Sequence, residues 1–437
     1  MTGGGGGIEA AARTRMGAGI MWCYSVKSRL AGFALLVGLL ALGGCAERNT
    51  AIYLPDTTAP EVSALAESGG TITWETDENS NCVLLYGQKA GIYDHYGYNV
   101  VDGGLSHHVD LIDVGSGRYY FRVMARDDAG NQTISEESST ELPVSHTPVA
   151  EPFVYTMIDV GWGDCHFLEF PSGTTVMIDA GSDSASHRAN VIDFLETRGI
   201  TPPAGITYMI GTHAHGDHLG GFPGSLVVFY HAAVFLAPEL ASVSVFQYLK
   251  KPLDEAGLTE RYGLRAGQTN EDTDFLKWDE EHGVRVKVMS AGAGRFFSPD
   301  NSGDSVNCDS AVLKVSYGRV DFLFTGDAEE FAEDLMIKDY GAELACEVLK
   351  VAHHGNDDAT SNLFLEWVRP RVGFISNSLV DNDGVFKQSV IDLLKSFGVN
   401  YYVTDRTYMD AARTAVPEYG NVTVTTDGET FVVSSWK

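Results

Sequence analysis

Three histidines and an aspartate fall within six consecutive residues, 213–218. Imidazole nitrogens and carboxylate oxygens are common protein ligands of divalent metal ions. His213 and His215 lie two residues apart, so both rings of an extended chain can turn toward one ion. Gly216 allows the chain to turn, after which Asp217 and His218 can serve a second ion. The spacing favours a metal site over a polar loop whose side chains only cap the backbone.

Further carboxylates and imidazoles follow other short apolar runs. Buried strands are predicted at 175–178 before Asp179, at 206–210 before the histidine cluster, at 320–325 before Asp327, and at 348–352, which runs up to His353 and His354. In α/β proteins, sites lie at the ends of strands. A single aspartate there can be a turn former, and a histidine pair can be a packed core feature. Their common placement favours one shared site.

These motifs resemble the metallo-β-lactamase superfamily of hydrolases, and in particular its ComEC-type branch. Besides His-x-His-x-Asp-His, the resemblance is carried by Asp159-Val160-Gly161-Trp162-Gly163-Asp164, Met177-Ile178-Asp179-Ala180-Gly181, Thr325-Gly326-Asp327 and Lys350-Val351-Ala352-His353-His354-Gly355. It extends over residues 153–433. It implies an α/β fold, the four-layer αββα sandwich, for a catalytic domain at 153–437.

The resemblance also implies two divalent metal ions. The first would be held by His213, His215 and Asp327, and the second by Asp217, His218, Asp327 and His354. Asp327 would bridge the two ions because a carboxylate has two oxygens. Imidazole and carboxylate ligation without thiolate favours zinc first and manganese second.

Asp217, His353 and Asp179 are the predicted catalytic residues. Two cations lower the pKa of a bridging water toward about 7, which supplies the nucleophile. Neighbours on an extended segment diverge, so we expect His354 to bind metal and His353 to face the substrate. His353 would then stabilise the oxyanion or protonate the leaving group, and Asp179 would orient a ligand histidine.

One departure concerns the first ion, to which many members of the superfamily add another histidine. This chain instead has Asn307-Cys308-Asp309-Ser310 before a strand expected at 311–315. Asn307 and Asp309 are therefore possible metal or substrate ligands. An oxygen or water in place of imidazole predicts a looser first site, at which manganese becomes relatively more acceptable.

Composition and charge limit the partners. The 437 residues include 44% hydrophobic residues, which is ample for folded cores, and the formal net charge is −29. Long-range attraction for nucleic acid is therefore disfavoured. We expect a small-molecule or cell-surface phosphodiester substrate, with nucleic acid less favoured.

The N-terminal region has the features of an export signal. Lys27 and Arg29 precede an apolar run at 30–42, which is too short to span a membrane. The run ends in Leu42-Gly43-Gly44-Cys45, which resembles a bacterial lipobox, and an ordinary cleaved signal is the alternative. We expect residues 1–45 to be a lipoprotein signal region with lipidation at Cys45, followed by a tether at 46–58. Localisation would be extracytoplasmic, with membrane contact through the lipid anchor only.

Residues 59–145 have the alternating pattern of an all-β sandwich and resemble a fibronectin type III module, joined to the catalytic domain by a linker at 146–152. Strands are expected at 71–76, 83–86, 109–112 and 119–125, with Trp74 in the core. His107 and His108 are expected on the surface. The widely spaced Cys82, Cys165, Cys308 and Cys346 should be mostly free, buried thiols.

Two classes of function fit these features. The first is a membrane-anchored, metal-dependent phosphodiesterase or esterase, with a nuclease acting on extracellular DNA as the alternative within it; the ComEC domain is associated with DNA processing. The second is a non-enzymatic surface-binding lipoprotein. Six intact polar ligands weigh against the second class, because a scaffold without metal does not need them. An amphipathic helix near 240–256 and a Gly-rich stretch up to 306 are expected to wall the cleft or to form a solvated connector.

We expect Cys45→Ser to release the protein from membranes, because the variant loses every acyl chain. Fractionation of wild type and variant cells measures this, with incorporation of a lipid label as a second readout. A variant that stays in the membrane pellet, beside a wild type that takes up no label, would disprove lipidation.

Overall fold

The structure is a computed structural model that describes residues 56–100, 104–146, 149, 151–202, 205–222, 226–227, 230, 232–239, 241, 244–294, 306–377, 386–404 and 420–435. The predicted signal region, Cys45 and most of the predicted tether lie outside the described residues. No helix within the described ranges is long and apolar enough to cross a membrane.

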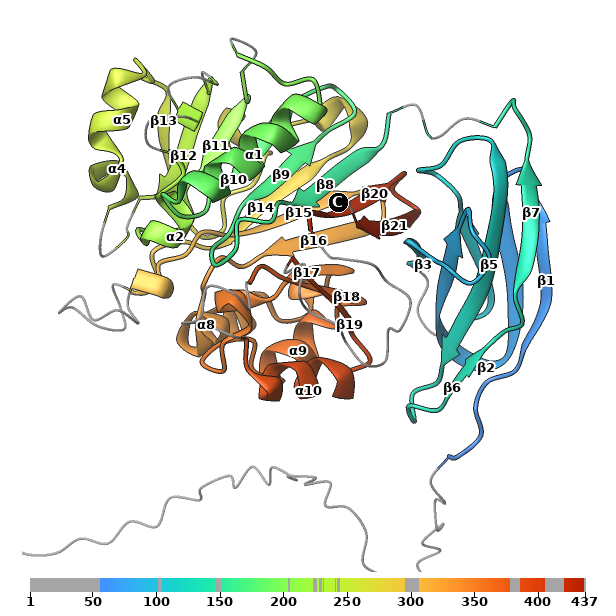
Figure 1. Cartoon of the computed structure of the whole chain (residues 1–437). Helices are drawn as coiled ribbons and strands as arrows, with labels where there is room; N and C mark the ends of the chain where they lie inside the picture. Colours follow the sequence, from blue (N-terminus) through green and yellow to red (C-terminus); the bar gives the residue numbers. More distant parts are fainter. Residues whose placement is uncertain are drawn as a thin grey trace, which may run out of the picture. The chain divides into compact units, whose positions relative to one another are not determined.

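The C-terminal part of the chain contains two β-sheets (Figure 1). The first has the order β13-β12-β11-β10-β9-β8-β20-β21. Its strands are β8 (Phe153–Met157), β9 (His166–Glu169), β10 (Thr175–Ile178), β11 (Tyr208–Ile210), β12 (Val234–Pro238), β13 (Arg261–Leu264), β20 (Val422–Thr426) and β21 (Thr430–Ser435). β10 to β13 are parallel to one another, as expected where helices connect successive strands.

The second sheet has the order β14-β15-β16-β17-β18-β19. Its strands are β14 (Arg285–Ser290), β15 (Val312–Tyr317), β16 (Val320–Phe324), β17 (Val348–Lys350), β18 (Val372–Ile375) and β19 (Asn400–Val403). β16 to β19 are parallel, so their carboxyl ends lie at one edge of the sheet.

Helices cover the outer face of each sheet. Those on the first sheet are α1 (Ala185–Thr197), α2 (Gly216–Leu219), α4 (Val245–Tyr248) and α5 (Lys250–Glu255), and those on the second are α8 (Glu330–Tyr340), α9 (Asn362–Val368) and α10 (Gln388–Ser396) (Figure 1). Short 3₁₀ turns lie at η2 (Asp274–Leu276), η3 (Glu280–His282), η4 (Gly341–Leu344) and η5 (Ala352–Gly355). The predicted four-layer αββα sandwich is confirmed.

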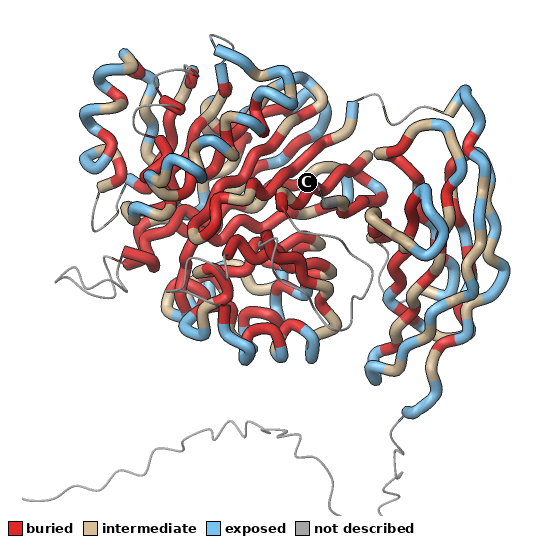
Figure 2. Tube along the Cα trace, viewed as in Figure 1, coloured by how far each residue is buried: buried red, intermediate tan, exposed pale blue. Residues whose placement is uncertain are grey.

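Aromatic side chains fill the space between the two sheets. Phe153 meets Phe322 edge to face with ring centroids 4.9 Å apart, and Tyr155 meets Phe324 in the same way at 5.0 Å. Such pairs add to the hydrophobic gain of burial and fix how the sheets stack. Most residues of the strands are buried, except in the edge strand β13, while the outer faces of the helices are exposed (Figure 2).

Residues 62–142 form an antiparallel β module. Its strands are β1 (Val62–Ser68), β2 (Thr71–Gly87), β3 (His95–Asn99), β4 (Gly104–Asp110), β5 (Gly117–Arg126), β6 (Gln132–Ile134) and β7 (Ser138–Leu142). The strands predicted at 71–76 and 83–86 are one continuous strand, β2. Its first part pairs with β1 and β4, and its second part pairs with β3 and β5. One long strand therefore serves both sheets of the module.

Two histidines of this module differ in environment. His108 is exposed, as predicted, but His107 is buried, so the prediction of two surface residues is wrong for His107. Its ring stacks on Trp74 at 5.5 Å, and its Nε2 lies 3.0 Å from the hydroxyl of Thr76. The predicted core position of Trp74 is confirmed.

Two further expectations concern local structure. The helix expected near 240–256 is two short helices, α4 and α5, with Leu249 between them. Pro252 has no N–H to donate, and it lies in the first turn of α5, where proline is tolerated. The four cysteines of the described residues are free and buried, as expected.

β21 also pairs with β3 of the N-terminal module, so one sheet continues across both parts. Tyr98 of β3 stacks on Phe431 of β21 with ring centroids 4.8 Å apart, and its hydroxyl lies 2.7 Å from that of Tyr402 on β19. All three side chains are buried.

We expect Phe431→Ala to lower the free energy of unfolding by about 3–5 kcal/mol, because it opens a cavity beneath Tyr98. Denaturant unfolding monitored by circular dichroism measures this, with the exposed Leu363→Ala as the control. A loss below about 1 kcal/mol would show that the packing of Phe431 against Tyr98 contributes little to stability.

Candidate metal centre

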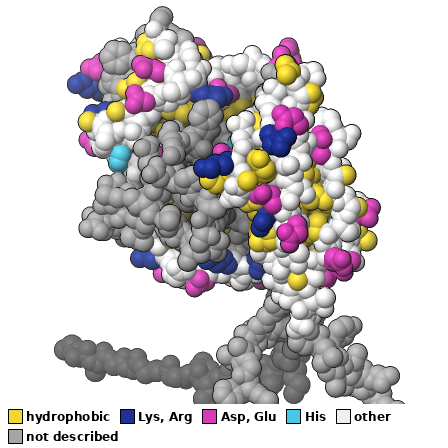
Figure 3. All heavy atoms as spheres, turned by 45° about the vertical axis from the view of Figure 1, so that its right-hand side comes forward, with side chains coloured by type: hydrophobic (Ala, Val, Ile, Leu, Met, Phe, Trp, Pro, Cys, Tyr) yellow, Lys and Arg dark blue, Asp and Glu magenta, His cyan; other side chains and the backbone are white. Residues whose placement is uncertain are grey.

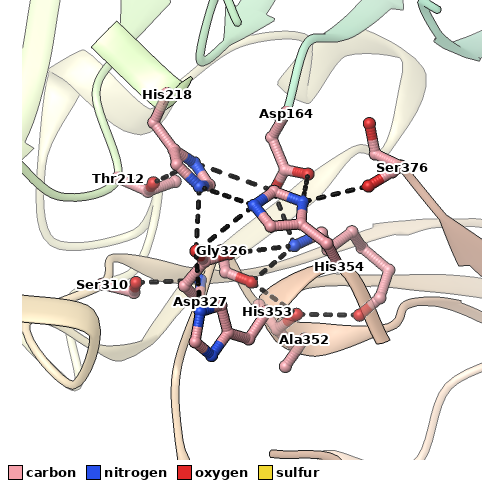
Figure 4. Close-up of polar contacts among 12 residues, drawn as sticks. Asp164, Thr212, His218, Ser310, Gly326, Asp327, Ala352, His353, His354 and Ser376 are labelled. Carbon is pink, nitrogen blue, oxygen red and sulfur yellow. Dashed lines mark hydrogen bonds and ion pairs between the residues drawn. The ribbon is translucent and has the colours of Figure 1, made fainter. Parts of the chain in front are cut away.

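Strand ends from both sheets meet at one place. Asp179 follows β10 and the histidine cluster follows β11, while Asp327 follows β16 and His353 and His354 follow β17. β10 and β11 are parallel, as are β16 and β17, so each pair delivers its polar residues to one edge. Figure 4 shows His218, Asp327 and His354 pointing toward one another from different elements.

The predicted ligands of the first ion converge in the structure. His213 Nε2 lies 3.1 Å from His215 Nδ1 and 3.8 Å from Asp327 Oδ2. Ligands held about 2.0–2.2 Å from one tetrahedral ion are roughly 3.3–3.6 Å apart. The distance from His213 Nε2 to His215 Nδ1 is slightly shorter than this range, and the distance to Asp327 Oδ2 is slightly longer.

The predicted ligands of the second ion form an adjacent group. His218 Nε2 lies 3.0 Å from Asp327 Oδ2 and 3.3 Å from His354 Nε2. His354 Nε2 lies 3.4 Å from Asp327 Oδ2 and 3.5 Å from Asp217 Oδ2. The facing atoms of His218, Asp327 and His354 lie close to the donor spacing of one metal ion, and Asp217 joins them through His354.

Asp327 belongs to both groups through a single oxygen. Oδ2 is the atom that faces His213, His218, His353 and His354, whereas Oδ1 lies 3.4 Å from Lys350 Nζ. The expectation that Asp327 would use both oxygens therefore differs from the structure, because a buried ammonium occupies the second one.

The other nitrogen of each buried ligand ring has a partner of its own. His218 Nδ1 lies 2.7 Å from Asp179 Oδ2, and Asp179 also accepts hydrogen bonds from the backbone N–H and hydroxyl of Thr212. His354 Nδ1 lies 3.0 Å from the carbonyl oxygen of Ser376. An N–H that donates from Nδ1 fixes the tautomer and leaves Nε2 to bind metal.

His213 is held in the same way by hydroxyl groups. Its Nδ1 lies 3.1 Å from Thr212 Oγ1 and 3.3 Å from Ser310 Oγ, and Ser310 Oγ accepts a hydrogen bond from the backbone N–H of Asp327. Ser310 therefore connects the ligand from the first sheet to the bridging aspartate of the second.

Several site residues have left-handed backbone conformations. Asp179, His353 and His354 have φ values of 58°, 47° and 55°. Such residues cost about 1–3 kcal/mol each and cluster at functional sites. The expectation of an extended segment at His353 and His354 is wrong. The two rings nevertheless separate, with centroids 6.2 Å apart, because of this turn.

His353 lies at the edge of the donor groups. Its Nε2 is 3.9 Å from Asp327 Oδ2, and its Nδ1 is 2.8 Å from Asp358 Oδ1. Burial lowers the pKa of His353, but the hydrogen bond to Asp358 and the charge of Asp327 outweigh burial and raise it. The side chain therefore has a fixed tautomer and one nitrogen directed at the site.

The electrostatics favour positive charge at the second donor group, whereas burial lowers the pKa of His213 and of His215 in the first group. Burial opposes protonation of His218 and His354, but Asp327, with Asp179 at His218 and Asp164 at His354, holds the pKa of both rings well above the ordinary value. Burial also opposes ionisation of Asp327, yet the pKa of that carboxyl lies well below its usual range because of His218, His354 and Lys350. A divalent cation supplies such charge and displaces the protons.

Three residues that contact the predicted metal ligands or their rings belong to the sequence motifs but had no predicted role. Asp164, Lys350 and Trp162 belong to the segments at 159–164 and 350–355. Asp164 Oδ1 lies 3.3 Å from His354 Nδ1, and its Oδ2 lies 3.8 Å from His218 Nδ1 and 2.6 Å from Lys350 Nζ. Because Asp164 faces the Nδ1 side of both rings, it is placed to orient them. Its carboxylate also belongs, with His218, Asp327 and His354, to a buried group whose ligand atoms lie within 4.8 Å of one another.

Trp162 contacts two ligands of the second group. Its indole N–H donates to Asp217 Oδ2 at 2.7 Å, and its ring lies against His354 with centroids 4.6 Å apart. Gly163 makes this approach possible, since its φ is 127° and a Cβ would collide with the carbonyl oxygen of Asp217. In the sequence, the glycines on either side of Trp162 were the feature that could have indicated a close backbone approach at this residue.

Asn307 and Asp309 lie beside the site and are buried. Asn307 Nδ2 donates to Glu329 Oε1 at 2.6 Å and lies 3.5 Å from His353 Nε2. Its Oδ1 accepts no hydrogen bond from a described residue, so this oxygen is free to receive one or to bind metal. Completion of the first ion by Asn307 or Asp309 stays a prediction.

The chain is similar to proteins of the ComEC type. It is 27% identical to ComE operon protein 3 of Bacillus subtilis over 267 residues, which are 57% of this chain and 31% of that protein. It is 39% identical to Recombination protein 2 of Haemophilus influenzae over 224 residues, which are 50% of this chain and 24% of that protein. The chain thus spans a third or less of these relatives.

No family model matches the chain. The crystal structure of CmlA, a diiron β-hydroxylase from Streptomyces venezuelae, has a TM-score of 0.39 and 10% sequence identity, with coverage of 79% of this chain and 76% of that one. The four-layer sandwich with polar strand ends agrees with the fold that the resemblance to the metallo-β-lactamase superfamily implies, and the chain is similar in sequence to ComE operon protein 3 and to Competence protein ComA of Neisseria gonorrhoeae.

We expect Trp162→Phe to weaken metal binding at the second group by about tenfold, because Asp217 loses its hydrogen bond while the aromatic packing on His354 is kept. Titration of metal-free protein with Mn²⁺ or Zn²⁺ measures this. Trp367→Phe, a change in a more exposed tryptophan on α9, is the control. Equal affinities in wild type and Trp162→Phe would contradict a role in orienting Asp217.

Proposed function

We propose that the protein is a metal-dependent hydrolase with a dinuclear centre, and most specifically a phosphodiesterase. The observation that carries the proposal is the position of Asp327 Oδ2, which lies 3.0–3.8 Å from donors of two adjacent imidazole groups. One carboxylate oxygen shared in this way suits two ions a few ångströms apart.

The donor set agrees with zinc or manganese. When bound, the ions would activate water for attack and neutralise charge on the phosphoryl oxygens. His213, His215 and Asp327 would hold one, and Asp217, His218, Asp327 and His354 the other. Because the donors are imidazole and carboxylate, we propose zinc as the preferred metal and manganese as the second choice.

His353 is suited to move a proton at the edge of this centre. Its Nδ1–H donates to Asp358, so Nε2 is the nitrogen available to the reacting group. Protonated at Nε2, His353 would donate to the oxygen of the leaving group or to the developing oxyanion. Asp358 acts through His353 by fixing the tautomer and the ring.

The substrate class follows from charge. A phosphodiester needs local neutralisation of its anionic oxygens, which two cations supply, but a long polyanion also meets the net charge of −29. On the face shown in Figure 3, acidic and basic side chains of the described residues are interspersed, without a continuous basic band. We therefore place small or cell-surface phosphodiesters first.

A nuclease is the second candidate. The similarity to Competence protein ComA of Neisseria gonorrhoeae, 29% over 99 residues, and to Recombination protein 2 favours it. Membrane anchoring through Cys45 belongs to either version of the proposal, and it would place the reaction outside the cell.

We expect Asp217→Ala to lose metal from the second group and to reduce turnover by at least about a hundredfold while the fold persists, because Asp217 lies in the first turn of α2, away from the core between the sheets. Turnover is measured with a nitrophenyl phosphodiester, a phosphorylcholine ester, single-stranded DNA and a cephalosporin, beside metal analysis.

Asp193→Ala on the exposed face of α1 is the matched control and should keep both metal and turnover. Metal binding without hydrolysis of any of the four substrates would reject the enzyme assignment. Preferred cleavage of DNA would replace the first candidate by the nuclease, and preferred cleavage of the cephalosporin would reject the phosphodiesterase.

A further inference from the structure

Lys350 places a buried ammonium group beside the bridging aspartate. The side chain, at the end of β17, is fully buried. Nζ lies 2.6 Å from Asp164 Oδ2 and 3.4 Å from Asp327 Oδ1, and it donates to the carbonyl oxygen of Gly326 at 2.7 Å. The proposed mechanism assigns Lys350 no role.

An ion pair with Asp164 would by itself satisfy a buried lysine. Burying a charge is costly unless it is paired and hydrogen-bonded, and Asp164 provides the closest carboxylate. The contacts of Nζ to the Gly326 carbonyl and to Asp327 Oδ1 are not needed for this pairing, and both are made to the turn that carries Asp327. Lys350 thus holds the backbone before the bridging residue and one oxygen of its side chain.

This contact determines which oxygen of Asp327 faces the imidazoles. The terminal torsion of aspartate is broad, so the carboxylate can turn between nearly equivalent positions. With Oδ1 drawn to Lys350, Oδ2 is left toward His218 and His354. The same ammonium is bound to Asp164, whose other oxygen lies 3.3 Å from His354 Nδ1.

We propose that Lys350 is the positioning residue of the metal bridge: it fixes the single-oxygen orientation of Asp327 and links it through Asp164 to His354. The proposal rests on the dinuclear centre proposed above. The positive charge of Lys350 also offsets one of the negative charges around the donors, which lowers the repulsion among the carboxylates of Asp164, Asp179, Asp217 and Asp327.

The test separates positioning from a simple buried ion pair. Lys350→Met removes the contact to Asp327 but also leaves Asp164 buried without its cation. The double variant Asp164→Asn with Lys350→Met removes both charges of the pair, and an asparagine oxygen can still accept from His354. Lys314→Met is the matched control, because Lys314 pairs with Asp321 at 2.8 Å and donates to two backbone carbonyls away from the site.

Each variant is measured by thermal unfolding without metal and by competition of a chelator for Zn²⁺ and Mn²⁺. The absorption spectrum of bound Co²⁺ reports ligand geometry independently of turnover. We expect Lys350→Met to bind metal about 10–100-fold more weakly and to alter the Co²⁺ spectrum. The double variant should regain thermal stability but not affinity, and Lys314→Met should keep wild-type affinity.

Wild-type affinity and spectrum in the double variant would overturn the proposal, since Lys350 would then serve only as the partner of Asp164. If Lys350→Met does not fold by itself, the double variant, which leaves no unpaired buried charge, carries the test. A wild type that binds none of the three metals would instead reject the dinuclear centre itself, so the two failures are distinguishable.

Discussion

The convergence of both sheets on one carboxylate oxygen is the constraint on which the site depends. His213, His215 and His218 follow a strand of the first sheet, whereas Asp327 and His354 follow strands of the second. Donor distances near 3–4 Å therefore require the two sheets to keep a fixed separation and register. Aromatic packing fixes this separation and register, because it tolerates little displacement. The edge-to-face pairs are Phe153 with Phe322 and Tyr155 with Phe324.

The same convergence is costly before metal binds. Asp164, Asp179 and Asp327 are buried among imidazoles, and buried charges need partners. Lys350 supplies positive charge beside Asp327, and the carboxylates around His218 and His354 raise the pKa of both rings against the effect of burial, so these rings hold protons more strongly. Metal binding exchanges those protons for a divalent cation, so affinity should fall at low pH, where the protons compete more strongly.

Buried strands and ligand spacing are local patterns, so the strand ends that carry polar residues could be predicted from the residues themselves. The four-layer sandwich was implied only by the resemblance to the metallo-β-lactamase superfamily, because periodicity does not specify how two sheets stack. Partners from distant segments were not accessible in the same way. Trp162 reaches Asp217 only because Gly163 lets two backbone segments meet, and Lys350 reaches Asp327 only because β16 and β17 are neighbours. The left-handed turn at His353 and His354 was also missed, because nothing in their residue types favours φ values above zero.

The N-terminal module shows a different limit of sequence patterns. A linker was expected to separate it from the catalytic domain, yet β3 pairs with β21, the strand that would otherwise be the open edge of the first sheet. An exposed edge strand is a site of unwanted pairing, and β3 covers it. β21 is the second strand of a hairpin whose first strand, β20, pairs with β8, and β8 carries Phe153 and Tyr155. The N-terminal module is therefore hydrogen-bonded, through one hairpin, to the strand whose aromatic side chains set the spacing of the two sheets.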